Sequence, residues 1–377
     1  MKDGRAVTSV AAFRHLNEKK ALIAMSGGVD SSVSAYLMQQ AGYECIGCTM
    51  RLYDYEIVGK SDMTCCAASD IADARAVAER LSMPHHVLHF EEEFRREVID
   101  RFVQSYEEGK TPNPCIDCNR FLKFGKMLEK ADELSCAKIV TGHYARITEE
   151  NGIFFLRKAA DESKDQSYVL YDLKQEDLRR ICFPLGELTK EQVRRIAEEN
   201  GFVNARKHDS QDICFVPDGD YAAVIEAYSG QRPAPGDFVD GEGRVLGRHR
   251  GIIHYTCGQR RGLGLSLKEP LYVCEIDPGS NRVILGKNKE LFRKDALVRD
   301  VNWISGEEPD SPVRAKVKVR YRQKEQPATI QPAGNGAVLV RFDEPQRAIT
   351  PGQAAVFYDG DIVLGGGRID KEQQRRT

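Results

Sequence analysis

The sequence contains no apolar run of the roughly 18 residues that a membrane-spanning helix requires. Its first residues, MKDGRAVTSVAAFRHLNEKK, also lack the continuous apolar core of a signal peptide. We therefore expect a cytoplasmic protein with no membrane partner. Charge of one sign is not in excess, because 55 Lys plus Arg stand against 57 Asp plus Glu. This balance neither requires nor excludes a nucleic-acid partner, since local patches matter more than totals.

The cysteines do not form the pattern of a secreted disulfide framework. There are eleven, an odd number, spread unevenly over 377 residues. In a reducing compartment, clustered thiols more often indicate catalysis or metal binding. The stretch TPNPCIDCNR at 111–120 is the clearest cluster, and its C-x-x-C spacing suits a metal site, iron-sulfur ligation or thiol exchange equally well.

The first half of the chain has the texture of an α/β domain. Strand-like runs at 21–25, 45–50, 85–90 and 138–144 are separated by stretches with helical spacing of apolar residues. Strands that alternate with helices predict a parallel sheet covered on both faces. A chain of this length also exceeds the size of one hydrophobic core, so two or three domains are expected.

After about residue 215, glycine and proline become frequent and short alternating stretches replace the helical periods. This pattern predicts two small, mainly β domains. We expect a catalytic domain at 1–217, with an N-terminal extension at 1–19, a central β-rich domain at 218–290 and a C-terminal β-barrel at 291–377. Basic residues gather in GRHRGIIHYTCGQRRG and PDSPVRAKVKVRYRQKEQP, and together these two patches favour a phosphate-backbone partner.

The segment SGGVDSS, residues 26–32, lies between a predicted strand and a predicted helix. Such a loop directs backbone N–H groups and the helix dipole toward one anionic group. It lacks the lysine and the spacing of a Walker loop and the G-x-G-x-x-G of dinucleotide folds. SGGxDS(S/T) at this place resembles the loop of the N-type ATP pyrophosphatases, which split ATP into AMP and pyrophosphate. The resemblance implies that Asp30 acts through Mg²⁺ on the pyrophosphate side.

Other motifs follow along the chain in one order: PNPxxxCN at 112–119, TGHYAR at 141–146, KDQSYVLY at 164–171, SQDICF at 210–215, VRYRQ at 319–323 and TPGQAAVFYDGDIVLGGG at 350–367. Together they resemble the tRNA-specific 2-thiouridylases, a family that replaces the C2 oxygen of the wobble uridine of tRNA with sulfur. The resemblance runs from about residue 20 to about residue 367.

The resemblance implies the site residues. ATP contacts fall on Ala24, Met25, Ser26, Gly27, Gly28, Val29, Asp30, Ser31, Met50 and Gly142. tRNA contacts fall on Asn113, Pro114, Cys115, His143, Lys164, Asp165, Gln166, Arg320, Tyr321 and Gln353. A lysine or arginine can neutralise phosphate, and a tyrosine offers a stacking face for an unpaired base.

The family's chemistry also assigns the thiols. AMP is transferred to the uracil C2 oxygen, and a persulfide on Cys214, loaded by an upstream cysteine desulfurase or relay protein, then supplies the sulfur. Cys118 is the nucleophile that attacks the persulfide, which leaves a Cys118–Cys214 disulfide. A moderated thiolate pKa is needed, and Arg120 and Lys123 are candidates to provide it.

One position leaves an alternative open. Many relatives carry aspartate where this chain has Cys115, so Cys115, Cys118 and Cys214 also form a ligand set for an iron-sulfur cluster with one open iron. Zinc is disfavoured because no fourth protein ligand is evident. The CIGC stretch predicts a buried strand, and neither Cys65 nor Cys66 is expected to bind substrate.

Two rival functions explain part of the sequence. A different ATP-dependent ligase or amidotransferase on the same loop accounts for SGGVDSS but not for Cys118 and Cys214. A non-catalytic tRNA-binding protein accounts for the basic β half but has no use for Asp30.

Overall fold

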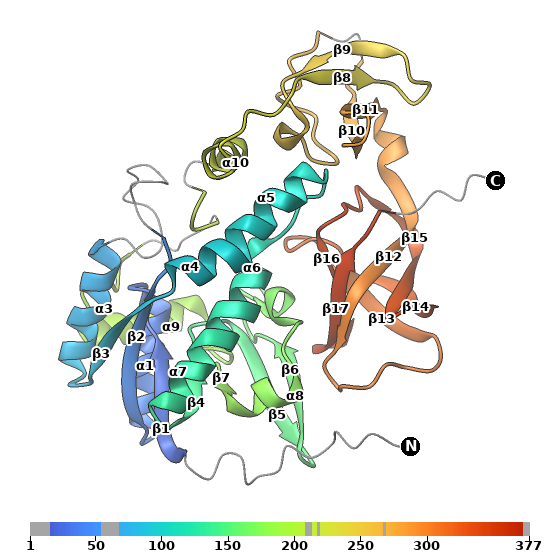
Figure 1. The fold of residues 1–377 in the computed structure, drawn as a ribbon. Coiled ribbons are helices and arrows are strands. Elements are labelled where there is room, and N and C mark those ends of the chain that lie inside the picture. The colour runs from blue at the N-terminus through green and yellow to red at the C-terminus, as the bar shows by residue number, and fades with distance from the viewer. Residues whose placement is uncertain (1–15, 54–67, 208–212, 217–218, 267–268, 372–377) are drawn as a thin grey trace, which may run out of the picture.

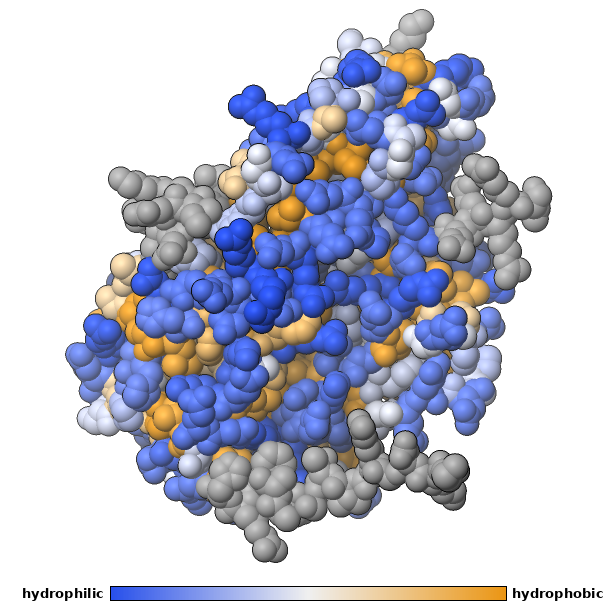
Figure 2. Space-filling view, viewed as in Figure 1, coloured by the Kyte–Doolittle hydropathy of each residue, from blue (hydrophilic) through white to orange (hydrophobic). Residues whose placement is uncertain are grey.

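A computed structural model describes residues 16–53, 68–207, 213–216, 219–266 and 269–371. Figure 1 shows an α/β part formed by the N-terminal half, a small sheet above it and a β-barrel beside both. The face drawn in Figure 2 is mostly hydrophilic, with smaller apolar areas between the polar ones. In the described part of the chain, no helix is long and apolar enough to cross a membrane.

The N-terminal sheet has five parallel strands in the order β3-β2-β1-β4-β7. The strands are β1 (Asn17–Ala24), β2 (Glu44–Arg51), β3 (His85–His89), β4 (Cys136–Val140) and β7 (Ile181–Cys182). The helices α1 (Val29–Gln40), α3 (Ala68–Arg80) and α9 (Lys190–Glu199) pack with one face of the sheet. The other face packs against α7 (Met127–Glu133) and α8 (Gln175–Arg180). The predicted parallel sheet with two covered faces is confirmed.

Strand β1 shows why both faces of the N-terminal sheet carry apolar side chains. Ala21 and Ile23 belong to the core under α1, whereas Leu22, between them, belongs to the core under α7. Successive side chains of a strand point to opposite faces, so a strand buried on both sides needs a continuous apolar run. The run ALIAM supplies it.

One long helical segment carries the C-x-x-C pair. It consists of α6 (Pro114–Asp117), a π-helical stretch (Cys118–Lys126) and α7, and both junctions keep right-handed helical dihedrals. Asn113 caps it by accepting a hydrogen bond from the N–H of Cys115, and Pro114 occupies the first helical position, where no N–H is needed. The preceding helical segment comprises α4 (Glu91–Phe94), a π-turn (Arg95–Ile99) and α5 (Asp100–Glu107).

The second half is mainly β, as predicted, except for α10 (Tyr221–Ser229). The central sheet has the order β10-β11-β8-β9, with β8 (Gly236–Val239), β9 (Val245–His249), β10 (Tyr272–Asp277) and β11 (Arg282–Gly286). Six strands follow: β12 (Phe292–Trp303), β13 (Val313–Lys318), β14 (Gln326–Gly334), β15 (Ala337–Arg347), β16 (Ala354–Asp359) and β17 (Ile362–Ile369). Pairing of β12 with both β15 and β17 closes them into a barrel.

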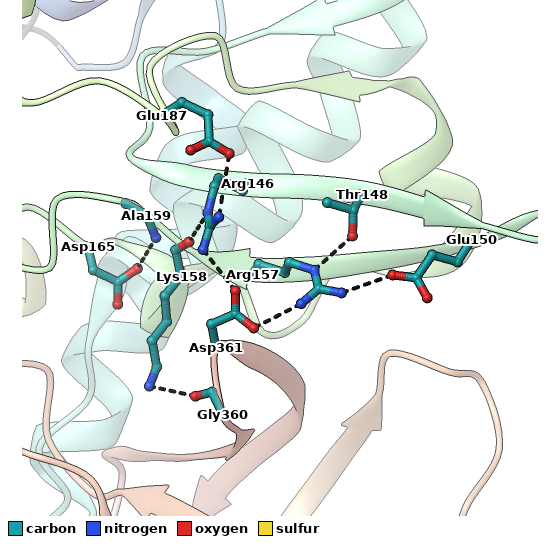
Figure 3. Close-up of polar contacts among 10 residues, drawn as sticks. All are labelled: Arg146, Thr148, Glu150, Arg157, Lys158, Ala159, Asp165, Glu187, Gly360 and Asp361. Atoms are coloured by element: carbon teal, nitrogen blue, oxygen red, sulfur yellow. Dashed lines mark hydrogen bonds and ion pairs between the residues drawn. The ribbon is translucent and has the colours of Figure 1, made fainter.

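The hairpin of β5 (Ala145–Glu150) and β6 (Ile153–Lys158) was not predicted. It lies within the N-terminal half of the chain but extends the sheet of the C-terminal barrel, where Arg157 pairs with Ile362 of β17. Arg146 and Arg157 both donate to Asp361, at 2.8 Å each (Figure 3). A pairing between segments about 200 residues apart leaves no signature in local periodicity. The hairpin therefore joins the first half of the chain to the barrel.

Candidate active site

A cavity of about 200 Å³ lies at the carboxyl ends of β1, β2 and β4. In open parallel sheets this edge is where ligands bind. Seven of the predicted ATP-binding residues line it: Ala24, Met25, Ser26, Asp30, Ser31, Met50 and Gly142. The lining also includes Lys123, His143 and Gln166. The structure thus brings the glycine loop together with residues from four other segments, while Gly27, Gly28 and Val29 form the turn and the helix start behind it.

The glycine loop is held in place by hydrogen bonds of a loop serine and by one from Asn204, which lies far along the chain. Ser31 Oγ donates to the carbonyl of Gly28 at 3.0 Å and accepts from the N–H of Ser26 at 3.2 Å. Asn204 Nδ2 donates to the carbonyl of Gly27 at 2.9 Å. Gly27 has φ +74°, and a Cβ there would lie 2.3 Å from the carbonyl oxygen of Asp70. Only glycine fits this turn.

Asp30 is engaged by two side chains that the sequence analysis did not identify. Lys190 Nζ lies 2.7 and 2.9 Å from its two carboxylate oxygens, and Tyr144 OH donates to Oδ1 at 2.8 Å. Lys190 opens α9 directly after Thr189, whose hydroxyl and the side chain of Gln192 form a reciprocal cap. The capping pattern in LTKEQ was the available signal, but it predicts only a helix start. A lysine is therefore fixed beside the acidic residue of the loop.

His143 is buried at the wall of the cavity. Its Nδ1 lies 2.7 Å from Thr141 Oγ1, and its Nε2 lies 3.4 Å from Lys123 Nζ. Burial, followed by the Lys123 charge, lowers the pKa of His143 well below its usual value. The imidazole is therefore neutral near pH 7, and an ammonium group points at the cavity beside it.

The burial of a neutral His143 predicts that the stability of the folded protein depends on pH. An unfolded histidine has a pKa of about 6.5, so below that pH the unfolded state binds a proton that folded His143 does not. Stability contributed by the neutral ring is present above pH 6.5 and falls by about 1.4 kcal/mol per pH unit below it. Thermal unfolding at about pH 7.5 and about pH 5.5 should show a smaller difference in His143→Gln than in the wild type. Equal differences would contradict this assignment, and His89→Gln, at an exposed histidine, is the control.

The three candidate thiols lie in different environments. Cys118 is 9 % exposed, Cys214 is partly buried and Cys115 is exposed. Cys118 and Cys214 pack into the same apolar cluster, which includes Phe94, Leu122 and Phe215. Polar residues flank Cys118 in the sequence. They are themselves buried and paired: Asn119 donates to the carbonyl of Val169, and Asp117 pairs with Arg368.

The described residues contain no group of three or more His, Cys, Asp or Glu side chains placed to hold a metal ion. Cys115, Cys118 and Cys214 all belong to the described part, so they do not converge as a ligand set in this structure. Arg120, a candidate for stabilising a thiolate, instead pairs with Asp172 at 3.1 Å. Cys65 and Cys66 lie outside the described residues, as does the 210–212 part of the SQDICF motif.

The C-terminal barrel makes hydrogen bonds and an ion pair with the helical segment that carries the C-x-x-C pair and with the residues just before it. The N–H of Thr111 donates to the carbonyl of Pro351 at 2.8 Å, and Gln353 Nε2 donates to the carbonyl of Thr111 at 2.7 Å. Arg368 of β17 pairs with Asp117, which is buried. The position of Cys118 is therefore set by the barrel as well as by the sheet.

Removal of the Arg368 charge should destabilise the protein. Arg368→Met leaves Asp117 buried without its partner, and breaking a buried pair in this way costs about 3 kcal/mol. Arg299→Met is the matched control, because its partner Asp370 lies at the surface and the loss should stay below about 1 kcal/mol. Urea unfolding followed by fluorescence compares the two. Equal losses of unfolding free energy would show that the buried Asp117–Arg368 pair stabilises the protein no more than a surface pair does.

Comparisons with known proteins agree over most of the chain. Residues 19–218 match the tRNA methyl transferase HUP domain, 222–287 match the tRNA methyl transferase PRC-barrel domain, and 293–369 match the aminomethyltransferase β-barrel domain. The tRNA-specific 2-thiouridylase MnmA of Clostridioides difficile is 48% identical over 355 residues, which cover 94% of this chain and 98% of that protein. The MnmA of Carboxydothermus hydrogenoformans is 49% identical over 360 residues, with 94% and 99% covered.

The chain belongs to the tRNA-specific 2-thiouridylase family.

The residues that the 2-thiouridylase family pattern assigns to tRNA divide into two groups. Arg320 and Gln353 are engaged within the protein. One Arg320 nitrogen donates to the carbonyls of Cys257 and Ala348 and to Thr350 Oγ1, and burial lowers the pKa of Arg320. This arginine therefore joins the central domain to the barrel.

A second group lies where the α/β part meets the barrel. Asp165 accepts from the N–H of Ala159 at 3.1 Å, and Gln166 Oε1 accepts from the N–H of Tyr144 at 2.9 Å. Lys164 precedes them in the sequence. Figure 3 shows Asp165 beside the hairpin whose arginines donate hydrogen bonds to Asp361. Tyr321 is exposed and meets Tyr168 edge to face. Tyr321 OH donates to the carbonyl of Asp165 at 3.4 Å, so the exposed ring lies beside the loop that carries Lys164.

Proposed function

We propose that this chain carries out ATP-dependent 2-thiolation of the wobble uridine of tRNA. One observation carries the proposal: the cavity of the glycine loop adjoins the cluster that contains Cys118 and Cys214. Met50 lines the cavity and also packs against that cluster. Lys123 lines the cavity from the helical segment that begins with the C-x-x-C pair. An activated uridine in the cavity would therefore lie next to the cluster that holds both thiols.

The cavity suits the activation step. The N-terminus of α1 and the loop N–H groups favour an anionic phosphate group. Lys190 is held within 3 Å of the cavity-lining Asp30 and can turn from this carboxylate to a departing pyrophosphate. Asp30 provides the oxygen ligand that Mg²⁺ prefers, and this ion, when bound, would neutralise pyrophosphate charge. The uracil C2 oxygen receives AMP in this step, which turns a poor leaving group into a good one.

The thiols suit the second step. The terminal sulfur of a Cys214 persulfide attacks C2, and AMP leaves with the original oxygen. The Cys118 thiolate then attacks Cys214 Sγ and breaks its bond to the terminal sulfur, which stays on C2. A Cys118–Cys214 disulfide forms, and two electrons are needed before the next turnover. No step is derived through an iron-sulfur cluster, because the three thiols do not converge here.

The partners follow from the same scheme. We propose that tRNA lies over the rim formed by Lys164, Asp165, Gln166 and Tyr321, with Asn113, Pro114 and Cys115 at its edge. A base splayed from the anticodon loop can stack on the exposed Tyr321 ring. A cysteine desulfurase or a relay protein that carries a persulfide loads Cys214.

Reconstitution tests the proposal. Purified protein is mixed with tRNA, ATP, Mg²⁺ and a persulfide donor, and thiolated uridine, AMP and pyrophosphate are measured. All three products are expected. AMP without thiolated uridine would indicate another ligase on the same loop, and tRNA binding with no product would indicate a non-catalytic binder. Iron and acid-labile sulfide, measured on anaerobically purified protein, test the cluster route, because thiolation without iron excludes it.

A further inference from the structure

Lys123 is a cation at the cavity wall, and its hydrogen-bond partner is a neutral ring. Its Nζ lies 3.4 Å from His143 Nε2, and burial lowers the pKa of His143 so that the imidazole is uncharged near pH 7. An ammonium group only donates, so Nε2 accepts and the ring proton lies on Nδ1, which donates to Thr141 Oγ1 at 2.7 Å. Two hydrogen bonds in series therefore orient the Lys123 side chain at the cavity.

Two other lysines near the glycine loop differ from Lys123, because carboxylates neutralise them. Lys190 Nζ lies 2.7 Å from Asp30 Oδ1. Lys207 Nζ lies 2.6 Å from Asp70 Oδ1. Among the residues that the structure describes, no carboxylate forms an ion pair with Lys123. A positive charge that lines a cavity and is not offset by an acidic side chain suits an anionic ligand in that cavity.

The neighbours of Lys123 connect it to both the glycine loop and the thiols. Gly142, which precedes His143, lies so close to the start of α1 that a Cβ there would be 2.9 Å from the carbonyl carbon of Asp30. Lys123 itself belongs to the π-helical stretch that begins at Cys118. Hydrogen bonds of a π-helix join residues five apart, so Lys123 follows Cys118 by about one turn. The ammonium group is therefore held near the reactants of both proposed steps.

We propose that Lys123 is a catalytic residue that binds the α-phosphate of ATP in both steps, an inference that rests on the proposed function. In the first step, the uracil C2 oxygen attacks the α-phosphorus, and the electron pair of the breaking P–O bond leaves with pyrophosphate. In the second step, the persulfide sulfur attacks C2, and the electron pair of the breaking C2–O bond leaves with AMP. N3 of the base loses its proton in the first step and regains one at the end of the second.

The charge of the α-phosphate explains why a fixed cation would help. The phosphate carries about one negative charge in the adenylated uridine, which is a phosphodiester. It approaches two negative charges in AMP, because a phosphate monoester has a second pKa of about 6. An ammonium group beside it therefore stabilises departing AMP more than the intermediate, and only such a difference accelerates a step. The hydrogen bonds through His143 hold Lys123 in place before the reaction begins.

Nucleotide affinity tests this role without turnover. In isothermal titration calorimetry, Lys123→Met should bind AMP about tenfold or more weakly than the wild type, because a hydrogen bond to a charged group is lost. Its affinities for adenosine and for pyrophosphate should stay within about twofold. Lys123→Arg keeps the charge and should recover most of the AMP affinity, which excludes a folding defect. Lys126→Met is the matched control, because Lys126 belongs to the same stretch and pairs with Glu129 at 2.8 Å on the surface.

Sulfur-substituted ATP identifies the phosphate that Lys123 contacts during the reaction. Sulfur accepts a hydrogen bond weakly, so ATP with sulfur on the α-phosphate should react about tenfold more slowly than ATP in the wild type. In Lys123→Met this ratio should shrink to about twofold, because the contact that senses the sulfur is gone. Sulfur on the β-phosphate should slow both proteins equally. The rate of AMP release in the presence of tRNA and Mg²⁺ is the measurement.

Three results separate the proposals. If Lys123→Met loses affinity for pyrophosphate and not for AMP, Lys123 binds the leaving group and the assignment to the α-phosphate is overturned. If AMP affinity is unchanged and only thiolation slows, Lys123 acts on the Cys118 thiolate, and the assignment is again overturned. If wild-type protein with tRNA, ATP, Mg²⁺ and a persulfide donor makes no thiolated uridine, the proposed function itself fails.

Discussion

Replacement of Cys214 by serine is expected to reduce sulfur incorporation by about 1,000-fold or more. A hydroxyl group cannot hold a persulfide, so the transferable sulfur has no carrier. Cys118→Ser should be nearly as damaging, because the persulfide then lacks the thiolate that releases its sulfur. AMP formation should persist in both variants, since Asp30 and Lys190 are untouched. tRNA affinity should stay within about twofold, because Cys214 is partly buried and the change is nearly isosteric.

The measurement is liquid chromatography of digested tRNA, with labelled ATP to follow AMP. Cys182→Ser is the matched control: it is also partly buried, with Sγ 3.7 Å from Met38 Sδ in the core of the sheet, and it should keep wild-type activity. More than about a tenth of wild-type thiolation in Cys214→Ser would refute the persulfide role.

Gly142→Ala should remove most of the ATP-dependent chemistry. A Cβ at Gly142 would lie 2.9 Å from the carbonyl carbon of Asp30 and 2.9 Å from the nitrogen of Ser31. These are backbone atoms of the first turn of α1, so they cannot rotate away as a flexible side chain could. The loop must shift by several tenths of an ångström, and a misplaced reacting group costs about 100-fold in rate.

The rate of AMP and pyrophosphate release with tRNA present measures this effect, and circular dichroism checks that the sheet is intact. Gly241→Ala is the control, because its nearest neighbour is Glu290 Oε2 at 4.0 Å and no strain is expected there. AMP formation equal to that of the control would show that the loop does not act as the ATP site.

Local patterns in the sequence predicted a good deal of this site. The run ALIAM followed by SGG specified strand β1 and its turn, because alternation of side chains and the need for glycine at φ +74° are properties of adjacent residues. The family resemblance assigned Met50 and Gly142 to ATP contact, and in the structure both line the cavity with that loop. The parallel sheet and the β-rich second half were likewise predicted.

Contacts between distant segments were not predicted. Lys190 on Asp30, the hairpin paired with β17, and Arg320 spanning two domains join residues 28 to 205 positions apart. The resemblance assigned Arg320 and Gln353 to tRNA, and the hydrogen bonds that both make within the protein were not foreseen. The type of a residue does not reveal which group will accept its hydrogen bonds in the folded protein.

The sequence by itself determined which chemistry the chain carries: a glycine loop for phosphate, a C-x-x-C pair and a third cysteine far along the chain. Only the tertiary structure decided which of the three thiols are covered and which is exposed. It packed the buried Cys118 and the partly buried Cys214 into one apolar cluster and left Cys115 exposed, because exposure depends on what the barrel and the neighbouring helices cover. Spacing sets which residues share a helix face, whereas burial is set by long-range packing.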